Sequence, residues 1–220
     1  MKQPYLVFIF FGPPGSGKGT QSVVLGQKLG LPVISTGDLL RRQEAAKSPL
    51  GLKARRYTKR GQLVPNKLIH QIIAARLAKR DTAKGFILDG YPRDAAQLDD
   101  LLALVQDKYI IWLIEVKVGD KEVINRISGR RICNACGASF HVLYKPPKQA
   151  GMCDVCGKKL SIREDDKPAV VRQRLADYKA TAAPLLAYGK KHKTLISING
   201  QQTIPKVRQD IFAKIVKLIK

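Results

Sequence analysis

Short runs of apolar residues recur along the chain, and five of them are rich in β-branched or aromatic side chains. These runs are Leu6–Phe11, Leu31–Ile34, Phe86–Leu88, Ile110–Val116 and Leu195–Asn199. A strand that is covered on both faces reads as a nearly continuous apolar run, because neither set of alternating side chains meets water. The pattern therefore predicts five buried β-strands.

The segments between these runs have helical periodicity. One of them places an apolar stripe along a single side of a helix, through Leu68, Ile69, Ile72, Ile73 and Leu77. Strands that alternate with helices are typical of a parallel sheet with helices on both faces. We therefore predict an α/β fold with a parallel five-stranded sheet flanked by helices.

Two stretches interrupt this alternation. Residues 35–64 have a helical pattern and no strand of their own, and residues 129–166 contain all four cysteines. We interpret both stretches as insertions into one core domain, which comprises residues 1–34, 65–128 and 167–220. A chain of 220 residues is long enough for one large core with small appendages.

A glycine-rich loop follows the first predicted strand and precedes a helix that is expected to begin near Lys18. Residues 12–20 read Gly-Pro-Pro-Gly-Ser-Gly-Lys-Gly-Thr. Glycines let backbone N–H groups approach phosphate oxygens, the helix N-terminus adds positive potential, and Lys18 supplies a point charge. The usual pattern has Ser or Thr directly after the lysine, so here Thr20 would supply the hydroxyl near magnesium. Strand, loop, lysine and helix together favour a P-loop NTPase-type fold over a merely structural turn.

The cysteines form two Cys-x-x-Cys pairs, each followed by glycine: Cys133 with Cys136, and Cys153 with Cys156. Four thiolates complete a tetrahedral structural zinc site, although the ligands alone do not distinguish zinc from iron. An insertion of 38 residues is too small for a good core, so a metal would replace the missing hydrophobic stabilisation. A disulfide-linked or merely reduced loop is the alternative. The apolar run near the N-terminus continues into the glycine loop without a cleavage-type segment, which favours metal over disulfides.

Four motifs resemble those of the adenylate kinase family, and they occur in the family's order. They are residues 12–21, Ser-Thr-Gly-Asp at 35–38 with Arg41, Gly-Phe-Ile-Leu-Asp-Gly-Tyr-Pro-Arg at 85–93 with Gln97, and Arg126 with Gly-Arg-Arg at 129–131. The resemblance spans nearly the whole chain, and the cysteines match the long form with a zinc-binding lid. It implies Mg-dependent phosphoryl transfer, ATP + AMP = 2 ADP, by in-line displacement with lid closure. It also implies that residues 35–64 bind the nucleoside monophosphate and that residues 129–166 form the lid.

The resemblance also assigns roles to individual residues. Contacts with ATP fall to Gly15, Ser16, Gly17, Lys18, Gly19, Thr20, Arg126, Arg130 and Gln202. Contacts with AMP fall to Thr36, Arg41, Val64, Gly90, Arg93, Gln97, Arg163 and Arg174. Catalysis falls to Lys18, Asp89, Arg93, Arg130, Arg163 and Arg174. These residue types suit the roles, because guanidinium groups offer forked donors to phosphate and Thr or Gln side chains offer donors and acceptors to a base.

Several of these residues have simpler interpretations. Thr36 would also serve as a helix cap, and Gln97 as an exposed residue on the surface of a helix. Arg126 and Arg130 are four positions apart, so we expect them on one helical face, which would otherwise be a solvated basic face. Asp89 ends a buried strand and is expected to orient magnesium-bound water beside the glycine loop. The carboxylates at 165 and 166 are expected to pair with arginines.

The chain is strongly basic, with 40 Lys and Arg against 17 Asp and Glu and a net charge of +23. This balance favours anionic partners, and we expect weak non-specific binding of polyanions in addition to ATP, AMP and ADP. A zinc-ribbon nucleic-acid-binding protein would explain the charge and the cysteines but not the glycine loop, Asp89 or the arginines. A kinase for UMP, CMP or GMP is a second alternative, and Thr36 favours adenine. No apolar stretch approaches the ~20 residues of a membrane span, so we expect a cytoplasmic monomer.

Overall fold

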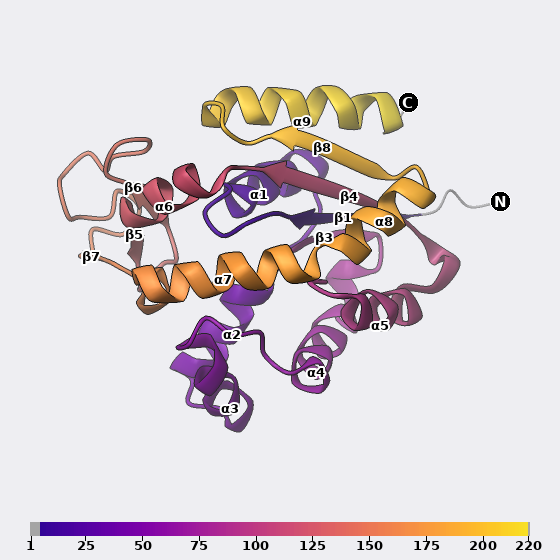
Figure 1. The fold of residues 1–220 in the computed structure, drawn as a ribbon, viewed down its shortest axis with the longest axis horizontal. Coiled ribbons are helices and arrows are strands. Elements are labelled where there is room, and N and C mark those ends of the chain that lie inside the picture. Colours follow the sequence, from indigo (N-terminus) through magenta and orange to yellow (C-terminus); the bar gives the residue numbers. More distant parts are fainter. Residues whose placement is uncertain (1–4, 220) are drawn as a thin grey trace.

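The computed structural model describes residues 5–219, and a parallel five-stranded sheet lies at its centre (Figure 1). The strand order is β2-β3-β1-β4-β8. The bounds are Tyr5–Phe11 for β1, Val33–Ser35 for β2, Gly85–Asp89 for β3, Tyr109–Lys117 for β4 and Leu195–Asn199 for β8. The five predicted strands and the α/β class are confirmed, and the strand ends differ from the predicted ones by at most two residues.

Strand β1 lies in the middle of the sheet, paired with β3 on one side and β4 on the other. Its residues 7–10 are completely buried. Val7 and Ile9 belong to one hydrophobic cluster, whereas Phe8 and Phe10 belong to another, so successive side chains enter the cores on opposite faces. Burial on both faces explains why the strand has no polar alternation.

Helices cover both faces of the sheet. Helices α1 (Lys18–Leu29) and α9 (Ile204–Ile219) pack against the cluster that contains Phe8, and Figure 1 shows α9 alongside β8 at the sheet edge. The opposite cluster receives side chains from α4 (Asn66–Leu77), α5 (Ala95–Val105) and α8 (Ala183–Lys191). The predicted apolar stripe on α4 is confirmed, since its three isoleucines are buried. Within residues 5–219, no helix has the length and hydropathy that crossing a membrane requires.

The expected insertion at 35–64 contains two helices, α2 (Thr36–Ala45) and α3 (Pro49–Thr58). They contact each other so closely that a Cβ at Gly51 would lie 2.2 Å from the backbone of Gln43. Both helices project from the core at the bottom of Figure 1. Ser35 still pairs with Asp89 in the sheet, so the first residue of the expected insertion completes β2.

The cysteine-rich segment forms a second, antiparallel sheet of β5 (Arg130–Cys133), β6 (Ser139–His141) and β7 (Leu160–Ser161). It lies beyond the carboxyl ends of the parallel strands, at the left of Figure 1, between α6 (Asp120–Ser128) and α7 (Pro168–Thr181). Three short 3-10 turns occupy Arg80–Thr82, Gln106–Lys108 and Glu164–Asp166.

The expectation that Arg126 and Arg130 share one helical face was wrong. Helix α6 ends at Ser128, and Arg130 is the first residue of β5. The chain turns at Gly129, where a Cβ would lie 2.4 Å from the ring of His141. This close approach of β6 stops the helix, so Arg130 belongs to the small sheet.

Candidate active site and metal centre

The glycine loop joins β1 to α1, and Lys18 begins the helix as predicted. Gly15 and Gly17 have φ angles of +72° and +92°, which a residue with a Cβ rarely adopts. Gly17 caps α1 without a side-chain hydrogen bond, so N–H groups at the start of the helix remain available to an anion. The Lys18 Nζ donates to the carbonyl of Pro13 at 3.1 Å. The loop therefore has the geometry of a phosphate-binding loop.

Asp89 lies at the carboxyl end of β3, beside the glycine loop. Burial raises the pKa of its carboxyl, and the charge of Lys18 partly opposes this shift. Burial likewise lowers the pKa of Lys18 to about 8, which Asp89 partly opposes. A Cβ at Gly19 would lie 3.1 Å from Asp89 Oδ2, so glycine after the lysine leaves room for the carboxylate. Among the described residues Asp89 Oδ1 is buried without a partner, and such an oxygen fits a magnesium ion or its bound water.

Arginines from several separate elements converge on the same region. Arg93 follows β3, Arg163 precedes the turn at 164–166, and Arg174 lies on α7. Desolvation by the surrounding protein and the charge of Arg174 lower the pKa of Arg93 to about 10, although the residue stays accessible to solvent from the pocket. Burial lowers the pKa of Arg163 to about 10 as well, with contributions from Arg41 and Arg130. Arg93 is affected by Arg174, and Arg163 by Arg41 and Arg130, so positive charges lie near one another in a region where a phosphate would neutralise them.

Two carboxylates hold part of this arginine cluster. Asp165 Oδ2 accepts from Arg174 Nη1 at 2.9 Å, and Asp166 accepts from Arg130. The expected pairing of these aspartates with arginines is confirmed. The Asp166 side chain is fully buried, so the ion pair ties the base of β5 to the segment that leads into α7.

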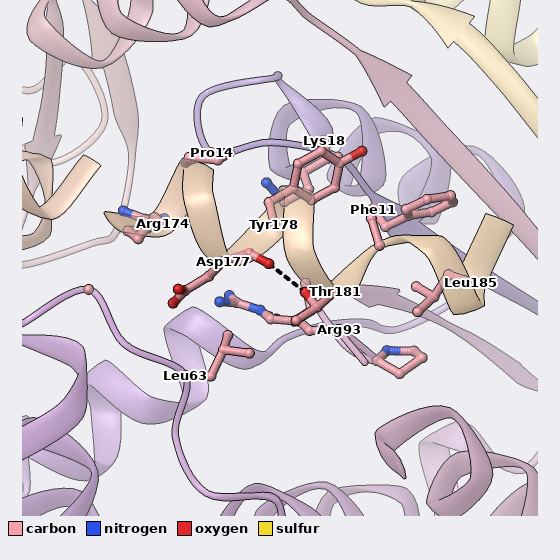
Figure 2. Close-up of a pocket in the computed structure, with 15 residues that line it drawn as sticks. Phe11, Pro14, Lys18, Leu63, Arg93, Arg174, Asp177, Tyr178, Thr181 and Leu185 are labelled. Carbon is pink, nitrogen blue, oxygen red and sulfur yellow. Dashed lines mark hydrogen bonds between the residues drawn. The ribbon is translucent and has the colours of Figure 1, made fainter. Parts of the chain in front are cut away.

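A pocket opens between the glycine loop, the insertion and α7. Figure 2 shows Lys18 and Arg93 on different sides of it, with Arg174, Asp177 and Tyr178 along the α7 wall. Apolar lining comes from residues such as Phe11, Leu63 and Leu185. The pocket thus combines cationic donors with apolar surface, as a nucleotide requires.

Four of the residues expected to bind AMP, namely Thr36, Gly90, Arg93 and Gln97, form one hydrogen-bonded group. Thr36 Oγ1 and Arg93 Nε both donate to the carbonyl of Gly90, at 3.0 and 2.8 Å. Gln97 is 3% exposed, so its interpretation as a surface residue was wrong. Thr36 is not the helix cap either, because the Ser35 hydroxyl accepts from the backbone N–H of Asp38. Val64 is also buried. It lies two residues before Asn66, whose side-chain oxygen accepts a hydrogen bond from Gln97.

Arg126 lies beside the glycine loop. Its Nε donates to Glu122 Oε1 at 2.6 Å, and its guanidinium lies 5.9 Å from the ring centre of Tyr144. The side chains of Arg126 and Arg130 are only 16% and 18% exposed, so the solvated-face interpretation was wrong for both. Gln202 donates to Asn199 O and Asp210 Oδ2 near the start of α9, and its contact with ATP stays a prediction.

The sequence argument missed Tyr144, Asn66 and Asp94. Tyr144 lies in an irregular part of the small sheet, where no pattern marked it. Asp94 could have been identified from the sequence, because Asp followed three residues later by Gln is typical of the start of a helix. In the structure its Oδ1 accepts a hydrogen bond from the backbone N–H of Gln97.

The four cysteines come together although 16 residues separate the two pairs. Their Sγ atoms all lie within 4.8 Å of one another, with Cys133 and Cys156 at 3.3 Å and Cys136 and Cys153 at 3.5 Å. A tetrahedral zinc site with Zn–S bonds of about 2.3 Å requires sulfur separations of about 3.8 Å. All four thiols are free, so the disulfide alternative was wrong for this structure. The cluster is positioned to bind a metal ion.

The two halves of the cluster have the same backbone geometry. Gly137 N donates to Cys133 O at 2.8 Å, and Gly157 N donates to Cys153 O at 2.9 Å. The surrounding hydrophobic cluster contains only Cys133, Phe140 and Cys153 as buried members. A bound metal would therefore provide much of the stabilisation that this small core lacks.

Comparison with known proteins agrees with this geometry. The family model described as "Adenylate kinase" matches residues 10–194. The chain is 45% identical to an adenylate kinase of Methanocella arvoryzae, over 96% of this chain and 99% of that protein. Adenylate kinases of Desulforudis audaxviator and Archaeoglobus fulgidus are 45% and 43% identical, over 94% and 96% of this chain and 98% of each relative. A nucleotide-binding phosphotransferase site on this fold, with such relatives, means that the chain belongs to the adenylate kinase family of nucleoside monophosphate kinases.

Proposed function

We propose that the enzyme catalyses Mg-dependent transfer of the γ-phosphoryl group of ATP to AMP by in-line displacement. The observation that carries this proposal is the convergence of Lys18, Arg93 and Arg174 on one pocket between the glycine loop, the insertion and α7. Phosphoryl transfer spreads charge over oxygens and needs little covalent help, so preorganised cations provide the main stabilisation of the transition state.

On the donor side, the backbone N–H groups of residues 15–20 and the Lys18 ammonium would bind the β- and γ-phosphates. Arg126 and Arg130 would approach ATP from α6 and β5. The position of Arg126 supports its role, because its Nη1 lies 3.5 Å from the carbonyl oxygen of Ser16 in the glycine loop. Gln202 would contact ATP from the start of α9.

On the acceptor side, Arg41 and Arg93 would hold the phosphate of AMP, while Thr36, Val64 and Gln97 contact its base. Support for this arrangement comes from the hydrogen bonds that Thr36 and Arg93 both donate to the carbonyl of Gly90, which hold the two side chains next to each other. Arg163 and Arg174 would bind the phosphoryl group as it moves between the two nucleotides.

Closure of the lid, residues 129–166, would bring Arg130 and Arg163 onto the phosphates and exclude water from the transfer. Support comes from the boundary of the segment, where Gly129 ends α6 and Lys167 precedes α7. The enzyme would act as a monomer, because the proposed donor and acceptor sites need no residue from a second copy. Four free cysteines suit the reducing conditions of the cytoplasm.

Magnesium is expected beside Asp89 and Thr20, where it would neutralise charge on the β- and γ-phosphates. Replacing Asp89 with Asn should raise the magnesium concentration needed for half-maximal activity, because the buried carboxylate would no longer attract the ion. A magnesium titration of ADP formation tests this, with Asp99→Asn on exposed α5 surface as the matched control. Equal magnesium requirements in Asp89→Asn and the unmodified enzyme would contradict the assignment.

The cysteine cluster should hold one tightly bound zinc per chain. Its removal with a chelator should lower the thermal midpoint before it changes the chemistry, because the metal stabilises a core-poor segment. Elemental analysis of protein purified under reducing conditions, followed by thermal unfolding with and without chelator, checks both parts. Protein that contains no metal, or a midpoint that chelation leaves unchanged, would refute this.

The remaining basic surface should bind polyanions weakly and without sequence preference. Lys190, Lys191, Lys193 and Lys217 are exposed and remote from the cleft. Their replacement by Glu should reduce RNA retention on a filter, while turnover at saturating substrates stays within about threefold because exposed charges are screened over ~8 Å. Loss of turnover with the fold intact would show that the basicity belongs to catalysis.

A further inference from the structure

The side-chain amide of Gln97 is held at both of its ends. Gln97 Oε1 accepts from the backbone N–H of Arg93 at 2.9 Å, and Gln97 Nε2 donates to Asn66 Oδ1 at 2.9 Å. Rotation of an amide by 180° exchanges its oxygen and nitrogen, so the neighbouring donors and acceptors decide which way it points. This amide therefore has one orientation that satisfies both neighbours.

That orientation is fixed by two groups whose polarity cannot be reversed. At one end, the backbone N–H of Arg93 only donates. At the other end, the Asp94 carboxylate only accepts, and its Oδ1 receives hydrogen bonds from Asn66 Nδ2 at 3.3 Å and from Gln97 N at 2.8 Å. Because Asn66 must turn its nitrogen toward Asp94, it presents its oxygen to Gln97. Asp94 is itself fixed as the N-cap of α5.

A fixed amide matters for the choice of base. After these two contacts Gln97 retains one N–H and one oxygen lone pair. Adenine carries a donor at N6 beside an acceptor at N1, whereas a 6-oxopurine carries an acceptor at O6 beside a donor at N1. An amide in one orientation complements the first pattern, and the inverted amide complements the second.

We propose that Asp94 and Asn66 are positioning residues that make the monophosphate site select adenine over 6-oxopurines by preventing inversion of Gln97. The inference rests on the proposed function, in which Gln97 contacts the base. Asp94 and Asn66 act through Gln97 alone, so their effect should fall on discrimination between bases and not on the reaction with ATP.

The test compares kcat/KM for AMP and for inosine monophosphate, which differs from AMP at the 6-position and N1. Asn66→Leu removes the acceptor for Gln97. Asp94→Gly removes the oxygen that holds Asn66, so the hydrogen-bonded chain can invert, and it costs the helix cap only a few tenths of a kcal/mol. In both variants the ratio of AMP to inosine monophosphate efficiency should fall by about 3- to 10-fold, the value of one hydrogen bond. KM for ATP and the thermal midpoint should stay near those of the unmodified enzyme, and the exposed control Asp99→Asn should leave the ratio unchanged.

A further variant, Gln97→Leu, distinguishes the contact between Gln97 and the base from the positioning of Gln97 by Asp94 and Asn66. If it lowers efficiency with AMP while both positioning variants keep the ratio within twofold, the base contact stands and the positioning proposal is overturned. If Gln97→Leu leaves AMP efficiency unchanged, the base contact itself is wrong, and the positioning proposal is overturned with it. Equal losses with both substrates, together with a lower thermal midpoint, would show a merely structural role and would also overturn the proposal.

Discussion

Replacement of Lys18 by Met should reduce kcat by about 100-fold or more, the loss typical when a preorganised donor to a developing charge is removed. The substitution deletes a cation that lies within the same cleft as Arg93 and Arg174. The fold should persist, since the Lys18 ammonium makes one hydrogen bond, to Pro13 O, and the methionine side chain has similar length. Steady-state ADP formation and thermal unfolding measure the two effects separately.

Lys28→Met provides a matched control for this result. Lys28 lies in the last turn of the same helix and is exposed, so its loss should leave activity unchanged. Near-normal turnover of the Lys18 variant would mean that the glycine loop is only a structural turn. A collapse of the thermal midpoint in that variant would assign the lysine to stability and not to catalysis.

Replacement of Arg93 by Ala should lower kcat/KM for AMP by about 30- to 1,000-fold, equivalent to about 2–4 kcal/mol of transition-state stabilisation. The change would remove the charge-assisted clamp that we propose on the AMP phosphate. It keeps the backbone N–H that holds Gln97, so the base site should remain assembled. KM for ATP should change much less than the efficiency with AMP.

The control for this variant is Arg80→Ala, which removes an exposed guanidinium from the turn before β3. Its kinetics should match those of the unmodified enzyme. An unchanged specificity constant for AMP in Arg93→Ala would place Arg93 on the surface with no contact to substrate.

The central sheet was predictable because its strands are buried on both faces. A run such as residues 7–10 has no polar member, and such runs have few structural interpretations. The strands of the small sheet were not predicted, because β7 has two residues and the segment has almost no hydrophobic pattern. Its cysteines were still predictable, since ligand spacing depends on chemistry and not on periodicity.

The position of Arg130 shows where sequence periodicity fails. A spacing of four residues is compatible with a helix, but the contact between Gly129 and His141 depends on a strand 12 residues further along the chain. The partners of Gln97 illustrate the same limit, because Asn66 lies 31 residues earlier. Residue types predict which side chains carry chemistry, whereas their mutual arrangement depends on tertiary contacts.

The assignment of AMP as acceptor is tested most directly by ADP formation from MgATP with each of AMP, UMP, CMP and GMP in turn. The account predicts that AMP is phosphorylated with by far the highest kcat/KM, because in the proposed site Thr36 and the oriented amide of Gln97 would contact the base. A comparable or higher kcat/KM with UMP, CMP or GMP would contradict it.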